Sequence, residues 1–300
     1  MKEQLRQIIQ RHSRPLEPTA TAAEQTLCEL HTIRAVLFDV YGTLLISASG
    51  DIGGGDSPSR AAAFASALQA LGVGQNMDVE RCVTCFYQTI QRQHQQARGE
   101  GVDFPEVNIL EIWELALKEM IDNGWLPTPA EKIDSRQLAV EYEVRVNPVW
   151  PMPGARRCLK QLRQAGLVLG VVSNAQFYTA ELFPALLGQA VDDLGLDPDL
   201  QYYSYQYGRA KPDTYLYELA RQALASRGIG AEEILYVGND MLNDMLPASK
   251  LGFRTALFAG DARSLRRREH DPRVKDVVPD IVLTELSALL RCVSSPPPPK

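Results

Sequence analysis

The chain has 300 residues, 45% of them hydrophobic, and a formal net charge of −6 at pH 7. This is enough for about two globular domains with a full buried core. The acidic balance argues against a nucleic-acid binder, and no apolar run approaches the roughly 18 residues that span a bilayer. Five cysteines, an odd number, do not suggest a disulfide framework. Because the N-terminus also lacks an apolar signal core, we expect a cytoplasmic protein with reduced thiols that does not contact membranes.

Residues 1–34 are predicted to be an N-terminal helical extension, amphipathic and interrupted at Pro15 and Pro18. From Ala35 the pattern changes to an apolar, β-rich run that ends at a Tyr-Gly-Thr turn, where glycine permits a sharp exit. This run predicts the first strand of the core. Residues 47–59 are rich in Gly and Ser and predict a mobile hinge loop.

Residues 57–146 predict a helical insert, because apolar residues recur there at spacings of three and four. Three tryptophans lie in or just after this region, Trp113, Trp125 and Trp150. We interpret them as core or hinge packing, with the lining of a pocket as the alternative.

After Pro148 the chain alternates amphipathic helices with nearly continuous apolar strands. This alternation is typical of a parallel sheet covered by helices on both faces. The predicted fold class is therefore α/β, with a Rossmann-like parallel-sheet core at 35–56 and 147–290. Residues 291–300 include four consecutive prolines and predict a disordered tail.

Polar groups follow several of the predicted strands, at the edge where α/β sheets bind ligands. They are Asp39, the pair Ser173-Asn174, Lys211 in a loop before a helix, and the group Asn239, Asp240 and Asp244. Each alone could be a turn or surface residue. Four such groups in this order predict a catalytic site. The basic run 263–268 is interpreted as a solvated surface segment.

In these residues the sequence resembles the haloacid dehalogenase superfamily of hydrolases. The four motifs that carry the resemblance are DVYGTL at 39–44, VVSN at 171–174, RAKPD at 209–213 and VGNDMLND at 237–244. Members carry a helical cap of the C1 type between the first two motifs, where the insert lies here. The resemblance covers the chain from about Ala35 to Gly260.

The resemblance implies that Asp39 is a nucleophile that forms a covalent intermediate with a small anionic substrate. Ser173 would bind a substrate oxyanion, and Lys211 would stabilise the charge of nucleophile and substrate. The expected substrate-binding residues are Gly42, Thr43, Asn174 and Asn239. The expected ligands of Mg²⁺ are Asp39, the backbone carbonyl of Tyr41, Asp240 and Asp244.

Tyr41 is the fourth expected catalytic residue, with Asp39, Ser173 and Lys211. It departs from the pattern of the phosphatases in this superfamily, which carry a second aspartate at this position as acid and base. A phenol is a poor substitute at neutral pH, and Asp-x-Tyr-Gly-Thr resembles the L-2-haloacid dehalogenases. The acids at 240 and 244 favour phosphoryl chemistry instead. We therefore expect a Mg²⁺-dependent phosphohydrolase. The alternatives are a metal-independent 2-haloacid dehalogenase and a catalytically weakened member that binds a ligand or partner. The oligomeric state is not readable.

Overall fold

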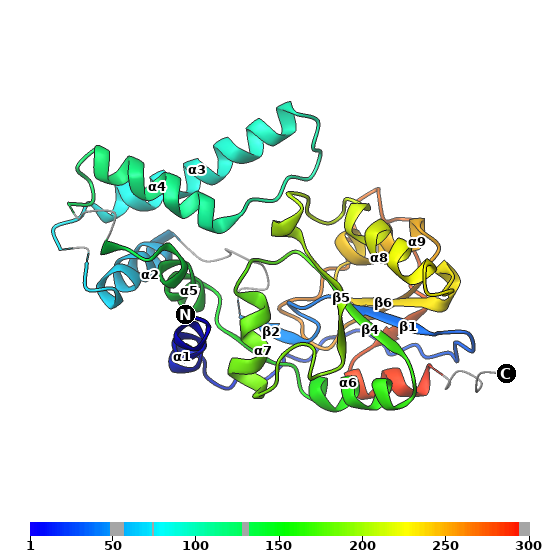
Figure 1. The fold of residues 1–300 in the computed structure, drawn as a ribbon. Coiled ribbons are helices and arrows are strands. Elements are labelled where there is room, and N and C mark those ends of the chain that lie inside the picture. The colour runs from blue at the N-terminus through cyan, green and yellow to red at the C-terminus, as the bar shows by residue number, and fades with distance from the viewer. Residues whose placement is uncertain (49–56, 74, 128–131, 294–300) are drawn as a thin grey trace.

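The structure is a computed structural model that describes residues 1–48, 57–73, 75–127 and 132–293. Its centre is a six-stranded parallel sheet with the strand order β5-β4-β1-β6-β7-β8 (Figure 1). The strands are β1 (Ala35–Phe38), β4 (Val168–Ser173), β5 (Leu196–Tyr203), β6 (Ile234–Gly238), β7 (Arg254–Phe258) and β8 (Ile281–Leu283). The predicted α/β class with a Rossmann-like sheet is thus confirmed.

Strand β1 lies in the middle of the sheet, and all four of its residues are buried. Phe38 is level with Val171 of β4 and with Val237 of β6. The residues that follow these three strands therefore emerge at the same edge of the sheet. An apolar run without alternation fits this position, because a central parallel strand is covered on both faces.

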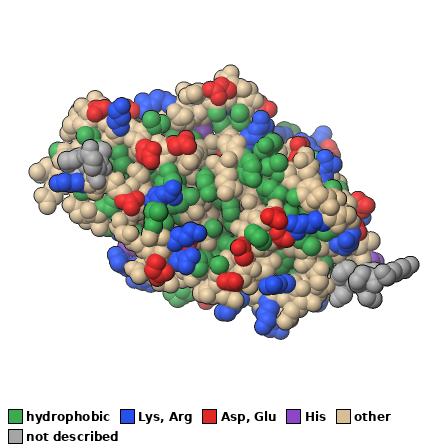
Figure 2. Space-filling view, in the orientation of Figure 1, with side chains coloured by type: hydrophobic (Ala, Val, Ile, Leu, Met, Phe, Trp, Pro, Cys, Tyr) green, Lys and Arg blue, Asp and Glu red, His purple; other side chains and the backbone are tan. Residues whose placement is uncertain are grey.

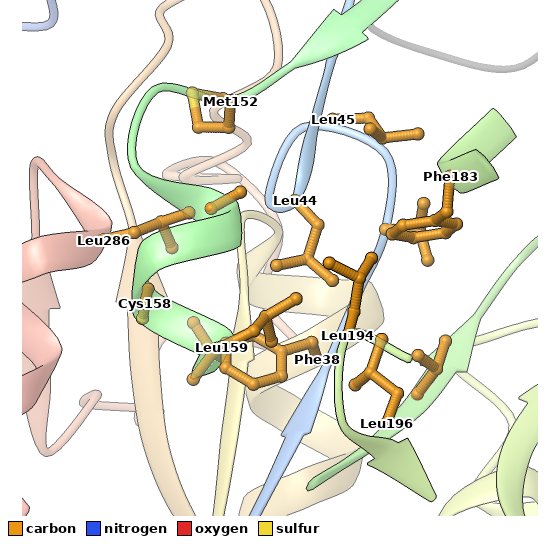
Figure 3. Close-up of a cluster of buried hydrophobic side chains, with 14 of the residues drawn as sticks. Phe38, Leu44, Leu45, Met152, Cys158, Leu159, Phe183, Leu194, Leu196 and Leu286 are labelled. Atoms are coloured by element: carbon orange, nitrogen blue, oxygen red, sulfur yellow. The ribbon is translucent and has the colours of Figure 1, made fainter. Parts of the chain in front are cut away.

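Helices cover both faces of the sheet, with α6 (Ala155–Gln164) on one face and α8 (Tyr215–Ala225) and α9 (Leu246–Lys250) on the other (Figure 1). Figure 3 shows the core on the α6 side, where Cys158 and Leu159 of α6 meet Phe38 of β1 and Leu286 near the C-terminus. Burying such side chains is the main stabilising contribution to the sheet.

The insert forms a separate helical layer beyond one end of the sheet (Figure 1). Its helices in the described ranges are α2 (Ser57–Ala70), α3 (Val79–Gly99), α4 (Ile109–Asp122) and α5 (Ser135–Val146). They share a hydrophobic core of their own. Trp113 is fully buried there and its ring lies 4.1 Å from that of Phe86. The predicted domain limits stay predictions.

The connections between insert and sheet pair with each other. Strand β2 (Leu45–Ser47) runs antiparallel to β3 (Val149–Pro151), and the Ser47 hydroxyl donates to Asn147 at 2.8 Å. The predicted hinge loop at 47–59 lies mostly outside the described residues. The two-stranded ribbon joins the two chain connections between the insert and the sheet.

The N-terminal extension contacts both parts of the molecule. Helix α1 (Lys2–His12) packs against α5 of the insert and α7 (Thr179–Leu187) of the core, and it buries Leu5, Ile8 and Ile9. Arg6 donates to Glu181 of α7 at 2.6 Å, and Gln4 donates to Gln137 of α5 at 3.0 Å. The helix thus links the helical layer to the sheet, which its amphipathic sequence did not indicate.

The C-terminal segment stays packed further than predicted. Cys292 and Val293, from the expected tail, are buried in the core, and 294–300 lie outside the described residues. Within the described ranges, no helix is long and apolar enough to cross a membrane. Acidic and basic side chains are interspersed over the face seen in Figure 2, so this face offers no continuous basic surface.

Candidate active site

Asp39 directly follows β1, and its backbone amide donates to the carbonyl of Val237 at 2.9 Å. Its side chain is buried, and its Oδ1 atom accepts hydrogen bonds from Lys211 Nζ at 2.7 Å and Ser173 Oγ at 2.8 Å. Ser173 is the last residue of β4, which is adjacent to β1. The structure therefore brings together three residues that the sequence places far apart.

Lys211 lies between two buried carboxylates. Its Nζ atom is 2.7 Å from Asp39 Oδ1 and 2.6 Å from Asp244 Oδ1. Burial lowers the pKa of Lys211, but Asp244 and Asp39 raise it more, so that the ammonium group stays protonated. The side chain of Asn174 holds the loop in place, because it accepts from the backbone amide of Lys211 at 2.7 Å and donates to its carbonyl at 3.3 Å.

Asp244 is the more deeply buried acid, with 1% of its surface exposed. Its Oδ2 atom accepts the backbone amides of Asn239 and Asp240, both at 2.9 Å. Burial, opposed by Lys211 and supported by Asp39 and Asp240, raises the pKa of Asp244 to about 6. One lysine thus faces two carboxylates, and the site carries surplus negative charge when both are ionised.

We expect Gly238→Ala to disable this site. A Cβ atom at Gly238 would lie 2.5 Å from Asp244 Cγ, so the carboxylate would have to move away from Lys211. Catalytic activity should fall by about tenfold or more, since side-chain misplacement of about 1 Å costs up to ~10²-fold. The matched control is Gly99→Ala, where a Cβ atom would meet nothing within 4 Å. Equal activity of the two variants would contradict the expectation.

Asp240 and Asn239 direct their side chains away from Lys211. Asp240 caps the turn that follows, accepting the amide of Leu242 at 2.8 Å, and pairs with Arg268, whose Nη2 atom lies 2.7 Å from Oδ2. Asn239 donates to the carbonyl of Ser264 at 2.6 Å and accepts from Thr43 Oγ1 at 3.2 Å. The expectation that 263–268 is merely solvated surface is wrong at Arg268, because Asp240 recruits its guanidinium as a counterion.

Tyr41 also points away from the nucleophile. Its hydroxyl group lies 2.9 Å from Thr179 Oγ1 on α7. Burial and, second, the nearby Glu143 raise its pKa well above the ordinary value for tyrosine. Tyr41 is therefore unsuited to exchange protons at neutral pH. The next residue, Gly42, has φ +84°, and a Cβ atom there would lie 2.6 Å from Ser264 Cβ, so the turn requires glycine.

A cavity of about 410 Å³ lies between the insert and this edge of the sheet. It reaches the core at Asn174 and Ala210, the neighbours of Ser173 and Lys211. The residues that line it include Tyr87, His94, Glu106, Trp113, Tyr142, Glu143, Gln176 and Tyr178. Apart from the tryptophan, none of these was singled out from the sequence, since they belong to no motif and come from five separate segments.

Segment 104–109 of the insert docks directly beside Lys211. The amide of Glu106 donates to the carbonyl of Gly208, and that of Ala210 donates to Phe104 at 2.8 Å. Gln176 donates to the carbonyl of Val107 at 2.8 Å. Backbone pairing of this kind closes the helical layer over the cavity.

The fold and the site together define a class of protein. It is an α/β protein with a carboxylate–lysine–carboxylate cluster at the carboxyl edge of a parallel sheet, covered by an inserted helical layer. Residues 33–252 match the family described as haloacid dehalogenase-like hydrolase. The chain belongs to this family, and the resemblance inferred from the four motifs is confirmed.

The curated relatives it resembles include a glyceraldehyde 3-phosphate phosphatase of Methanocaldococcus jannaschii, 30% identical over 126 residues, or 41% of this chain and 51% of the relative. Another is the Rhythmically expressed gene 2 protein of Drosophila melanogaster, 26% identical over 51% of this chain and 58% of the relative. The chain thus spans little more than half the length of these relatives.

Solved structures of similar fold include both chemistries. A 2-haloacid dehalogenase from Pseudomonas syringae pv. Tomato aligns with a TM-score of 0.54 and 19% identity, covering 87% of this chain and 97% of that one. A HAD phosphatase from Thermococcus onnurineus aligns with a TM-score of 0.51 and 17% identity, covering 86% of this chain and 97% of that one. These similarities establish the fold and leave the reaction to the residues of the site.

Proposed function

We propose that the protein is a Mg²⁺-dependent phosphohydrolase that transfers a phosphoryl group from a small anionic substrate to Asp39 and then to water. The observation that carries the proposal is the sharing of one lysine by Asp39 and Asp244. An anionic substrate would add further negative charge there, and a divalent cation would balance it. The partial similarity to a phosphatase agrees with this assignment.

In the proposed reaction, Asp39 attacks phosphorus through Oδ2. Lys211 and Ser173 both bind Oδ1, and among the described residues no hydrogen bond is made to Oδ2. The bond from phosphorus to the leaving oxygen breaks, and water then hydrolyses the aspartyl phosphate. Lys211 stabilises the negative charge on the transferred group. The backbone amides of Gly42 and Thr43 donate to the carbonyls of Leu45 at 2.7 Å and Val40 at 3.3 Å, so they would have to change partners to bind its oxygens. Asn174 and Asn239 hold the two flanking loops.

The donor set agrees with Mg²⁺. Within the described residues, no group of three or more His, Cys, Asp or Glu is arranged to hold a metal ion. Mg²⁺ needs only one or two carboxylates, however, with substrate oxygens and water completing its shell. Asp39 and Asp244 would supply these together with the backbone carbonyl of Tyr41. Asp240, paired with Arg268, is the weaker candidate. A bound Mg²⁺ would neutralise charge that develops on the phosphate.

The alternative, a 2-haloacid dehalogenase, is favoured by Tyr41, because a departing halide needs no proton. The surplus negative charge beside Asp39 counts against it. Its substrate is a carboxylate and its leaving group an anion, and the single charge of Lys211 is already shared by two acids. A member that binds ligands without turnover remains the second alternative.

The test is hydrolysis by the full chain of an aryl phosphate, an alkyl phosphate and 2-chloropropionate, with Mg²⁺ or with chelator. We expect phosphate release that needs Mg²⁺ and is at least about tenfold faster for the aryl ester. The reason is that position 41 carries a tyrosine and not an aspartic acid that would protonate the leaving oxygen. Chelator-resistant chloride release would establish the dehalogenase instead. Absence of all turnover would favour the binding protein.

A further inference from the structure

The cavity beside the site has aromatic walls. Phe86, Tyr87, Trp113, Tyr142 and Tyr178 all line it. Four of them form one packed group. The centroid of the Trp113 ring lies 4.1 Å from the ring centroid of Phe86 and 5.5 Å from that of Tyr142. Tyr87 and Tyr142 fix each other through their hydroxyl groups, 2.9 Å apart. Such walls are suited to a flat ring, which gains stacking and edge contacts beyond simple burial.

The cavity also lacks a cationic partner for an anionic ligand. Among the described residues that line it there is no lysine or arginine. Burial raises the pKa of Glu106, and it raises that of Glu143 to about 7. Burial and Arg98 lower the pKa of His94, which disfavours the charged form of its imidazole. An anionic group placed here would lose its hydration without gaining a counterion, at a cost of roughly several kcal/mol.

Two residues that line the cavity have a ring nitrogen without a hydrogen-bond partner among the described residues. Trp113 Nε1 and His94 Nε2 are buried, and neither makes a hydrogen bond to any described residue. An indole N–H can only donate, and leaving it unpaired costs about 1–3 kcal/mol. A ligand that carries a hydrogen-bond acceptor would recover this cost. Buried polar groups in protein cores are mostly paired, so both nitrogens are available to a ligand.

We propose that this cavity binds the leaving group of the substrate, and that this group is an uncharged aromatic alcohol with a hydrogen-bond acceptor on its ring. The proposal rests on the proposed phosphohydrolase function. Asp39 Oδ2 forms the new bond to phosphorus, and the electron pair of the broken bond goes to the phenolic oxygen. A phenolate is a far weaker base than an alkoxide, so it leaves without the acid that Tyr41 fails to provide.

The test is binding of three phenols to the full-length wild type, measured by calorimetry at about pH 6, below the ionisation of the phenol groups. They are 4-hydroxyacetophenone, with a ring and an acceptor, 4-ethylphenol, with a ring alone, and 4-hydroxybenzoate, with an anionic ring. We expect affinity to fall in that order. No detectable binding, or binding of the anion as tight as that of the ketone, would overturn the proposal.

Trp113→Phe separates the hydrogen bond from the aromatic wall. Affinity for 4-hydroxyacetophenone should fall about fivefold, the value of one net hydrogen bond, while affinity for 4-ethylphenol stays unchanged. Trp125→Phe is the matched control, because Trp125 is in the same helical layer but does not line the cavity. An equal loss for both phenols in Trp113→Phe would show a packing role alone and overturn the hydrogen bond.

The phosphate esters of the same phenols distinguish this proposal from the proposed function. If the esters are hydrolysed with kcat/KM in the same order as the affinities, both are supported. If the phenols bind in the expected order and no ester is hydrolysed, the phosphohydrolase assignment fails and the recognition of the ring stands. If the esters are hydrolysed at rates indifferent to the ring substituent, the recognition fails and the reaction stands.

Discussion

Asp39→Asn should abolish turnover, by about 10⁴-fold or more, and leave the fold intact. Asparagine has nearly the same shape, and its carbonyl oxygen can still accept from Ser173 and Lys211, which hold Oδ1 in the wild type. Its amide cannot form the covalent intermediate. Steady-state phosphate release and thermal unfolding followed by circular dichroism measure the two properties on the same preparation.

The control for this variant is Asp213→Asn. Asp213 belongs to the same motif as Lys211, but its side chain pairs with Arg209 at 3.1 Å and does not touch Asp39. Its activity should stay close to that of the wild type. A folded Asp39→Asn protein with wild-type turnover would refute the assignment of the nucleophile.

Lys211→Met should have the largest effect on stability. It removes the cation between Asp39 and Asp244 and leaves two buried carboxylates facing each other. Breaking a buried ion pair from one side typically costs about 3–5 kcal/mol in the free energy of unfolding. Activity should be lost as well, since the same ammonium group would stabilise the substrate.

The loss of stability in Lys211→Met should depend on pH, and the pKa of Asp244 determines the direction. Asp244 already has a raised pKa of about 6, and loss of Lys211 raises it further. Between the ordinary aspartate pKa and this raised value, the folded protein binds more protons than the unfolded chain, so stability falls as pH rises. The stability deficit of the variant should therefore be larger at about pH 8 than at about pH 5.

Denaturant unfolding at these two pH values measures the deficit. The matched control is Lys250→Met, because Lys250 is an exposed lysine at the end of α9. That variant should show almost no deficit at either pH. The electrostatic account would be contradicted if Lys211→Met lost no stability relative to the wild type, or if its loss of stability grew as pH falls.

The sequence alone determined the class of the protein and the strands that carry Asp39 and Ser173. The apolar run 35–38 defines a buried strand because its side chains do not alternate, and it places Asp39 at the strand's carboxyl end. The same reasoning placed Ser173 at the carboxyl end of β4. These predictions succeeded because they depend on local periodicity, which a short run of consecutive residues determines.

Strand β5 was not predicted, since Asp197, Pro198 and Asp199 interrupt its apolar pattern. Such residues are tolerated because β5 lies at the edge of the sheet, where one side needs no partner. The order of the strands was likewise not readable. It depends on which surfaces pack together.

The tertiary structure also separated the two acids of the fourth motif. Their spacing gave no reason to prefer either, but Asp244 turns inward to Lys211 while Asp240 is held by Arg268, 28 residues further on. The docking of α1 and the aromatic cavity were decided in the same way. Each joins segments from distant parts of the chain, and such contacts depend on shape and burial in three dimensions, which no local pattern of residues records.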